Sequence, residues 1–281
     1  MSNIRYDFTN KVAIVTGGAS GIGKATVEIL AEADAKIVLV DTHRLNGEAM
    51  AGQFPDQVMF VEGDVSDPAT ADCAVGVAIG HFGAIDILVN NAGIEFNDRG
   101  NLFSMNMEYL RRIVDVNMWG YVYMMRACFL YLKRGGRIIN VSSLQGVAAA
   151  SPGTIYQATK AAILGLTKAA AIELAFEGIT VNSVLPGAIA TEGMGAARGA
   201  ESEVTINALR RRIPIGRRGH AHEVAAAILF LASQEASYIT GTELEIGGGM
   251  RASLNADNPN APTPNVPNDP DAGTVCSEED V

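Results

Sequence analysis

Tyr156 and Lys160 stand four positions apart and are well suited to transfer a proton. Residues at i and i+4 of a helix lie on one face, so a helix here would place the phenol beside the ammonium. A neighbouring positive charge favours the phenolate and lowers a tyrosine pKa from its reference of about 10. Tyr156 would then serve as an acid or base near neutral pH. Taken alone, such a pair is more often an ordinary surface Tyr and Lys.

Two further polar residues are candidates for the same site. A short apolar run, 137–141, predicts a buried strand that delivers Ser142 and Ser143 to its carboxyl end. Asn117 lies in the middle of a predicted helix over 106–133, among apolar residues, where its amide must find a partner or cost stability. Taken alone, Asn117 would be a satisfied core amide. A helix over 154–176 is predicted to carry Tyr156 and Lys160.

A glycine-rich turn near the start predicts a dinucleotide site. The apolar run 11–16 reads as a buried strand, a helical pattern covers 24–33, and a second strand, 36–41, ends in Asp41. Glycines between strand and helix allow a sharp turn and close approach of a pyrophosphate, and the helix N-terminus supplies amide donors. The cofactor-binding candidates of this turn are Gly17, Ser20, Gly21, Ile22 and Gly23.

Asp41 indicates which of the two nicotinamide dinucleotides, NAD or NADP, we expect. A carboxylate at this strand end can accept hydrogen bonds from both ribose hydroxyls of an adenosine, whereas a 2′-phosphate would meet like charge. NAD is therefore predicted in preference to NADP, although Arg44 lies close enough in sequence to soften the preference.

Other strand ends supply the remaining candidates. The strand 58–61 leads to Asp64 and Val65, and Asp64 could hold an adenine amino group or cap the helix predicted over 66–82; both readings stay open. The strand 86–90 runs into Asn91, Ala92 and Gly93, small enough for close approach of a ring or ribose. A strand over 178–185 is closed by Pro186 and Gly187.

The rest of the chain completes the pattern. Residues 192–212 are typical of a lid loop, a helix is predicted over 223–232, and a seventh strand over 242–246. The alternation of strands and helices predicts an α/β fold, a Rossmann-like doubly wound parallel sheet of about seven strands with helices on both faces. Residues 1–250 would form one domain. The Pro/Asn/Asp-rich tail, 251–281, is predicted to be disordered or to pack on a neighbouring subunit.

Taken together, the motifs from Lys11 to Gly249 resemble the short-chain dehydrogenase/reductase family in its single-domain form. The glycine turn after Thr16 resembles its cofactor motif, and Asn90 to Gly93 its motif after the fourth strand. The resemblance implies that Asn117, Ser143, Tyr156 and Lys160 are its catalytic tetrad. It also implies that the segment of Pro186, Gly187, Ile189 and Thr191 holds the nicotinamide carboxamide.

The resemblance gives each tetrad member a role. Tyr156 would be the base in alcohol oxidation and the acid in ketone reduction, and Lys160 would lower its pKa and hold the nicotinamide ribose. Ser143 would hydrogen-bond the reacting oxygen, and Asn117 would fix a water that links Lys160 to solvent. The implied activity is NAD-dependent interconversion of a secondary alcohol and its ketone. The alternatives are an NADPH-dependent carbonyl or ketoacyl reductase and a non-catalytic NAD-sensing protein.

The expected substrate is an uncharged, cyclic or aromatic alcohol, because the residues beside the motifs are mostly small or apolar. The pocket is predicted from Ile94–Asn97, Leu144–Gly146, Ser151–Gly153 and residues from Ala188 onward. The charged residues Glu95, Arg99 and Arg198 also lie in these loops. Family resemblance further suggests a homotetramer, or a homodimer, built on the helices 106–133 and 154–176, whose alanine- and leucine-rich faces could serve core or interface.

The composition limits the partners and the cellular location that we expect. The chain has 281 residues, 48% of them hydrophobic, and a formal net charge of −10, which disfavours a nucleic-acid partner. Three widely spaced cysteines show neither a disulfide framework nor metal-ligand spacing, which favours a reducing, cytoplasmic location. No signal segment or membrane-spanning run is evident, so no membrane partner is expected.

Overall fold

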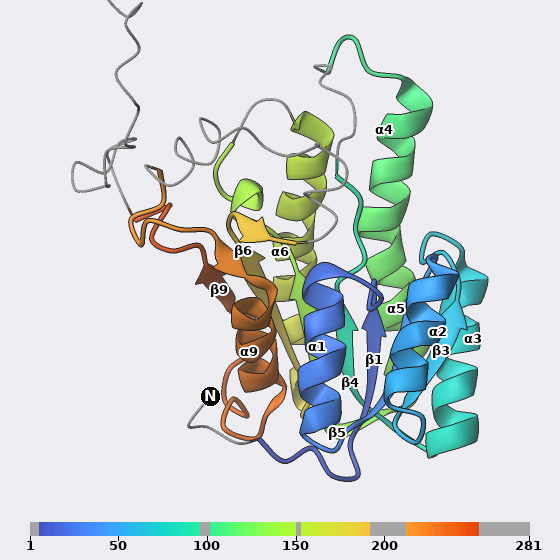
Figure 1. The fold of residues 1–281 in the computed structure, drawn as a ribbon. Helices are drawn as coiled ribbons and strands as arrows, with labels where there is room; N and C mark the ends of the chain where they lie inside the picture. The colour runs from blue at the N-terminus through green and yellow to red at the C-terminus, as the bar shows by residue number, and fades with distance from the viewer. Residues whose placement is uncertain (1–5, 96–101, 150–152, 192–211, 253–281) are drawn as a thin grey trace, which may run out of the picture.

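The computed structural model describes residues 6–95, 102–149, 153–191 and 212–252. A parallel seven-stranded sheet runs through it in the order β3-β2-β1-β4-β5-β6-β9 (Figure 1). The order reverses between β1 and β4, which confirms the doubly wound topology and places a ligand crevice at the carboxyl ends of the strands. The strands are β1 (Val12–Thr16), β2 (Lys36–Asp41), β3 (Val58–Glu62), β4 (Ile85–Asn90), β5 (Leu132–Val141), β6 (Thr180–Pro186) and β9 (Glu243–Ile246).

Helices cover both faces of the sheet because the strands are apolar on both sides. In β1, Ala13 and Val15 face one core, while Val12 and Ile14 face the other. The first core is shared with α1 (Gly21–Glu32), α2 (Arg44–Gln53) and α9 (Ala221–Ala232). The second is shared with α3 (Pro68–Val77), α5 (Gly120–Phe129) and α6 (Thr154–Leu174).

The helix predicted over 106–133 is divided in the structure. It comprises α4 (Met107–Val114), a π turn over Asp115–Trp119 and α5, and the chain enters β5 already at Leu132. The prediction of a strand starting at 137 was therefore too short, and a register irregularity between Ile85 and Ile87 accommodates the longer strand. Asn117 lies inside the π turn, a rare conformation that is frequent at functional sites.

Other elements agree more closely with the predictions. The helix predicted over 66–82 is α3 followed by a π turn over Ala78–Phe82, and the helix over 154–176 is α6 with a short 3₁₀ turn. A pair of two-residue strands, β7 (Ile189–Ala190) and β8 (Gly219–His220), was not predicted, because strands this short carry no periodic signal.

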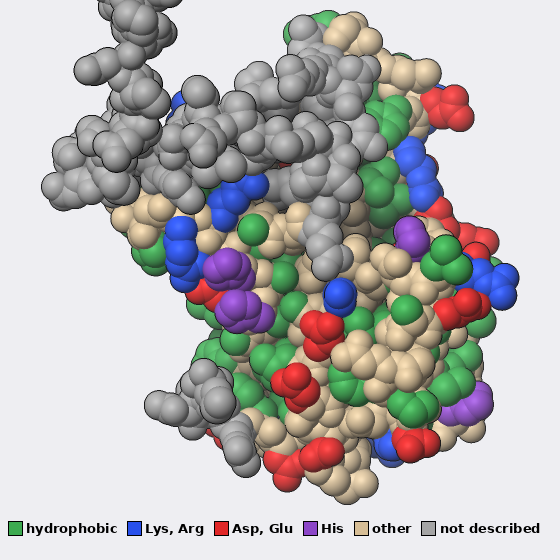
Figure 2. Space-filling view, viewed as in Figure 1, with side chains coloured by type: hydrophobic (Ala, Val, Ile, Leu, Met, Phe, Trp, Pro, Cys, Tyr) green, Lys and Arg blue, Asp and Glu red, His purple; other side chains and the backbone are tan. Residues whose placement is uncertain are grey.

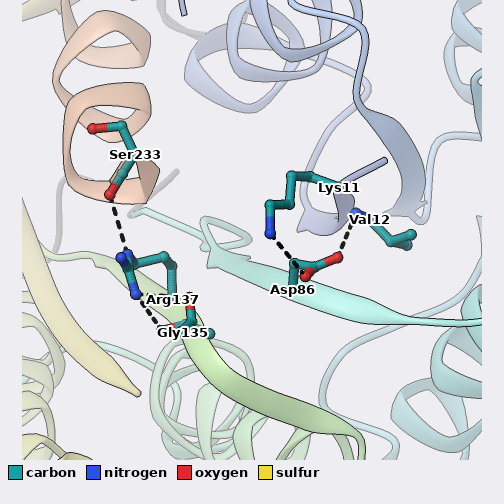
Figure 3. A network of polar contacts seen from close by, with 7 residues as sticks. Lys11, Val12, Asp86, Gly135, Arg137 and Ser233 are labelled. Carbon is teal, nitrogen blue, oxygen red and sulfur yellow. Dashed lines mark hydrogen bonds and ion pairs between the residues drawn. The ribbon is translucent and has the colours of Figure 1, made fainter. Parts of the chain in front are cut away.

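Polar contacts toward the amino-terminal ends of the strands join elements far apart in sequence (Figure 3). Asp86 accepts hydrogen bonds from the Val12 amide at 3.0 Å and from Lys11 Nζ at 3.4 Å. Arg137, which is buried, donates to the carbonyls of Ser233, Gly135 and Gly136, so β5 is tied to the end of α9. These contacts lie at the opposite end of the strands from the crevice and stabilise the fold.

Several predicted features fall outside the described residues. They include most of the proposed lid, nearly all of the tail and the pocket candidates Phe96, Asn97, Arg99, Ser151, Met194 and Arg198. Within the described part of the chain, no helix is long and apolar enough to span a bilayer. On the face drawn in Figure 2, acidic and basic side chains are interspersed over the described surface.

Candidate active site

The glycine turn connects β1 to α1 and is shaped for a phosphate. Helix α1 begins at Gly21, and the side chain of its N-cap residue, Ser20, makes no capping hydrogen bond, so the first-turn amides keep their donors. Gly17 has a φ of +63°, and a Cβ on Gly23 would lie 2.0 Å from the Gly17 carbonyl oxygen. Only glycines fit these positions. The turn between β1 and α1, called the glycine cradle below, suits a dinucleotide pyrophosphate.

Asp41 closes the adenosine side of this cradle. Its Oδ2 accepts from the Ala19 amide at 3.0 Å, and its Oδ1 accepts from the His43 amide at 2.8 Å. Arg44, the residue that might have accommodated a 2′-phosphate, directs its Nε to Glu48 at 2.7 Å and lies 4.0 Å from Glu62. The region therefore presents carboxylates, and its arginine is already paired.

Asp64 does not cap the helix that follows it. That cap is Asp67, whose side chain accepts from the Ala69 amide at 2.9 Å. Asp64 instead accepts from the Ser66 amide and hydroxyl and pairs with Arg112 of α4. Burial raises the pKa of Asp64, but these partners outweigh it and hold the pKa below its usual value. The adenine contact remains a prediction for Asp64. The Val65 side chain is buried in the core.

The segment after β4 joins the cofactor cradle to the catalytic candidates. Asn91 Nδ2 donates to the carbonyls of Thr16 and Gly17, and the amides of Asn91 and Ala92 donate to Thr16 Oγ1. A Cβ built on Gly93 would lie 3.4 Å from both Asn117 Oδ1 and Lys160 Nζ. Asn91 thus fixes the turn, and Gly93 allows the two polar groups to approach.

Asn117 is fully buried and its side chain is satisfied by protein. Its Oδ1 accepts from the Ile94 amide at 2.8 Å, and its Nδ2 donates to the Ile94 carbonyl at 2.9 Å. The amide therefore locks the segment after Gly93 against the π turn.

Ser143, Tyr156 and Lys160 come together at the carboxyl end of β5. Ser143 accepts from the Gln145 amide at 3.1 Å and hydrogen-bonds with Tyr156. Lys160 Nζ lies 5.7 Å from the centroid of the Tyr156 ring and donates to the Val141 carbonyl at 2.8 Å. The four-residue spacing on α6 and the end of β5 therefore bring these three predicted residues together.

The pKa of Tyr156 differs from the sequence-based expectation. Burial and, to a smaller extent, the negative charge of Glu95 raise the pKa of Tyr156 to about 12, and the hydrogen bond with Ser143 opposes both. Burial also lowers the pKa of Lys160 to about 8, with Glu95 opposing the change. The net pKa of Tyr156 is therefore above its ordinary value, in contrast to the expectation, because burial of the phenol outweighs the effect of the neighbouring ammonium, which donates to the Val141 carbonyl.

The predicted carboxamide segment lies beside the glycine turn. A Cβ on Gly21 would lie 3.3 Å from Thr191 Cγ2, so Thr191 reaches the pyrophosphate cradle. The Gly187 amide donates to the Ile246 carbonyl at 2.9 Å, which fixes the segment to β9 just after Pro186. The Ile189 side chain is buried in the core, so only its backbone can face a cofactor.

A cavity of about 370 Å³ is lined by residues that adjoin two of the sequence motifs, but not by Ser143, Tyr156 or Lys160. Leu144, directly after Ser143, forms one wall, and Ala188 forms another, as predicted. Its further apolar lining comes from Ile189, Ile213, Ile215 and Met250.

Sequence reasoning missed two residues of this region. Arg112 pairs with Asp64 across a long sequence separation, and Tyr121 hydrogen-bonds the Val141 carbonyl that also holds Lys160. Neither has a local signal, because an arginine on an amphipathic helix and a tyrosine in an apolar helix are both ordinary.

Comparisons with known proteins agree with this geometry. A family model described as enoyl-(acyl carrier protein) reductase matches residues 17–251. The 3-oxoacyl-(acyl-carrier-protein) reductase of Vibrio cholerae is 38% identical over 85% of this chain and 97% of its own. The trans-4-hydroxycyclohexanecarboxylate dehydrogenase of Sinomonas cyclohexanicum is 35% identical over 91% of this chain and 98% of its own.

A solved structure from Brucella melitensis, described as a short-chain dehydrogenase/reductase and glucose/ribitol dehydrogenase, superimposes with a TM-score of 0.83. It is 30% identical and covers 88% of this chain and 99% of its own. Together with the parallel sheet and the convergence of Ser143, Tyr156 and Lys160, these matches show that the chain is an oxidoreductase of the short-chain dehydrogenase/reductase family.

Proposed function

We propose that this chain is an NAD-dependent oxidoreductase that interconverts an uncharged secondary alcohol and its ketone, with Tyr156 as the acid/base. The observation that carries the proposal is the meeting of Ser143, Tyr156 and Lys160 at the carboxyl end of β5, beside a glycine cradle closed by Asp41.

The protein's part in the reaction is positioning and proton transfer. The residues that would hold the cofactor are those of the glycine turn with Asp41, the segment after β4, and Thr191. The bound nicotinamide supplies the hydride acceptor or donor. Ser143 orients the reacting oxygen toward Tyr156, whose phenolate takes the alcohol proton in oxidation and whose hydroxyl returns it in reduction. Lys160 provides the positive charge that favours the Tyr156 phenolate.

The charges of the cavity lined by Leu144 and Ala188, two residues predicted for the substrate pocket, support an uncharged substrate. Its two arginines are already paired: Arg217 with Glu223 at 2.7 Å, and Arg251 with Glu245. Of the described residues lining it, none therefore offers an unpaired positive charge to a substrate carboxylate. The Sinomonas relative is named for a cyclic secondary alcohol, so cyclic alcohols are the first compounds to test, although that compound also carries a carboxylate.

The test is cofactor-dependent absorbance of the reduced nicotinamide across cyclic, aromatic and open-chain alcohols and ketones, with NAD and NADP in parallel. Turnover with NAD on uncharged alcohols supports the proposal. Turnover only with NADPH on acyl thioesters would replace it with a ketoacyl reductase, the activity named for the Vibrio relative. NAD binding without turnover across the panel would favour a regulatory NAD-binding protein.

Asp41→Ala is expected to reduce the preference for NAD over NADP by about tenfold to a hundredfold, mainly by improving NADP binding. Loss of one carboxylate removes the repulsion of the 2′-phosphate, while Arg44 stays restrained by Glu48. The kcat/KM for each cofactor measures this effect. Asp67→Ala, which removes a carboxylate from a helix cap, is the matched control and should leave the ratio unchanged. An unchanged ratio in Asp41→Ala would contradict the role of Asp41.

We also propose that the chain forms a homotetramer through α5 and α6. Exposed apolar side chains on and next to these helices support the proposal: Trp119, Phe129, Ile172 and Phe176. Of the two uses considered for the α6 face, Ala170 belongs to the core, whereas Ala161 and Ala169 are exposed. Light scattering after gel filtration should give four times the mass of one chain, and Ile172→Glu with Phe176→Glu should lower it. A monomeric wild type would refute the assembly.

A further inference from the structure

Tyr121 of α5 is a buried tyrosine whose hydroxyl hydrogen-bonds the Val141 carbonyl, which also binds Lys160. Its side chain is 1% exposed, and its hydroxyl donates to the Val141 carbonyl at 2.9 Å. A buried tyrosine normally needs such a partner, because its hydroxyl is otherwise costly to remove from water. A leucine or methionine would fill the same apolar space without that requirement, so packing alone does not account for the hydroxyl.

The same carbonyl also binds Lys160. Lys160 Nζ donates to the Val141 oxygen at 2.8 Å and lies 3.5 Å from the Tyr121 hydroxyl oxygen. The ammonium also lies 5.5 Å from the centroid of the Tyr121 ring and 5.7 Å from that of the Tyr156 ring. Two aromatic rings therefore flank one buried cation, within the range at which a ring attracts a cation.

The surroundings of Lys160 explain why such support is needed. Lys160 is 4% exposed, and burial disfavours its charged form. The titratable groups that face it are Tyr121 from α5, Tyr156 from its own helix and Glu95 from the segment after β4. Burial raises the pKa of Tyr121 above its ordinary value, so this hydroxyl stays protonated, donates to Val141 and leaves its oxygen lone pairs to the ammonium.

We propose that Tyr121 is a positioning residue for the reaction: it holds the Lys160 ammonium against the Val141 carbonyl, charged and directed toward Tyr156. The inference rests on the proposed function, because it acts through Lys160 on the acid/base Tyr156. It adds a fifth residue to the four that the sequence motifs identify, and that residue acts through Lys160.

Tyr121→Phe is the direct test, because it keeps the ring and removes the hydroxyl. Without the hydroxyl oxygen the ammonium is less stabilised, so the Tyr156 phenolate is also less favoured. The alkaline rise in kcat/KM for alcohol oxidation should move upward by about half a pH unit to one pH unit, and kcat at neutral pH should fall by about threefold to tenfold. ADP binding, which requires only the adenosine half of the cradle, should stay within about twofold.

Tyr123→Phe is the matched control, since it removes a hydroxyl from the same helix where the ring stacks on Trp119. Its pH profile should match that of the wild type. Should Tyr121→Phe fail to fold, Tyr121→Met takes its place, with a larger shift expected because the ring is also lost; an unmoved pH profile in whichever variant folds overturns the inference. Failure of the proposed function looks different: wild type itself would then show no alcohol oxidation, or Tyr156→Phe would retain it.

Discussion

Tyr156→Phe is expected to lower kcat by about 10²-fold to 10⁴-fold while leaving NAD binding within a few-fold of wild type. The change removes only the hydroxyl that hydrogen-bonds with Ser143 and that we propose exchanges a proton with the substrate. The ring stays beside Lys160, so the adenosine cradle and the lysine environment are preserved. Steady-state turnover and NAD titration by protein fluorescence measure the two quantities separately.

Tyr131→Phe provides the control for this experiment. Tyr131 is 44% exposed and stands just before β5, at the opposite end of that strand from Ser143, so its hydroxyl should not affect turnover. Near-normal turnover in Tyr156→Phe would remove Tyr156 from the role of acid/base. A loss of NAD binding together with turnover would show that the phenol supports the cofactor instead of the chemistry.

The features predictable from sequence are those with a local cause. The strand Val12–Thr16 is apolar on both faces and was recognised as a buried parallel strand, and Gly17 to Gly23 follow it in an order that only a tight turn to a helix explains. Tyr156 and Lys160 meet because helical spacing puts them on one face. In each case the residues that determine the structure are neighbours in the chain.

The features that sequence reasoning missed depend on contacts between distant residues. Asp64 and Asp67 are both plausible caps by position, and the outcome depends on Arg112, which approaches Asp64 from another helix. The Asn117 side chain, inside the π turn, likewise finds its hydrogen-bond partner in the backbone of Ile94, 23 residues away. The raised pKa of Tyr156 was not foreseen because its largest cause, burial, is a property of the packed structure.

Substitution of Lys160 tests whether its buried charge supports catalysis while it lowers the stability of the folded protein. Lys160→Met is expected to lower kcat by about 10²-fold or more, because the positive charge beside the Tyr156 phenol disappears. The same change should leave the thermal unfolding midpoint at neutral pH unchanged or raise it, because methionine fills similar space without a buried charge. The Val141 carbonyl keeps the hydrogen bond from Tyr121 at 2.9 Å, so it is not left without a donor.

The pH dependence of stability gives the sharper measurement for Lys160→Met. Burial lowers the pKa of Lys160 from 10.5 to about 8 in the folded protein, so the unfolded chain binds more protons between these values. Wild-type stability from this group therefore rises with pH across that window, and below pH of about 8 the folded protein bears the full cost of a buried ammonium. The gain of Lys160→Met over wild type should be largest at neutral pH and shrink toward pH of about 10. A gain that does not change with pH would mean that packing, and not the buried charge, separates the two proteins.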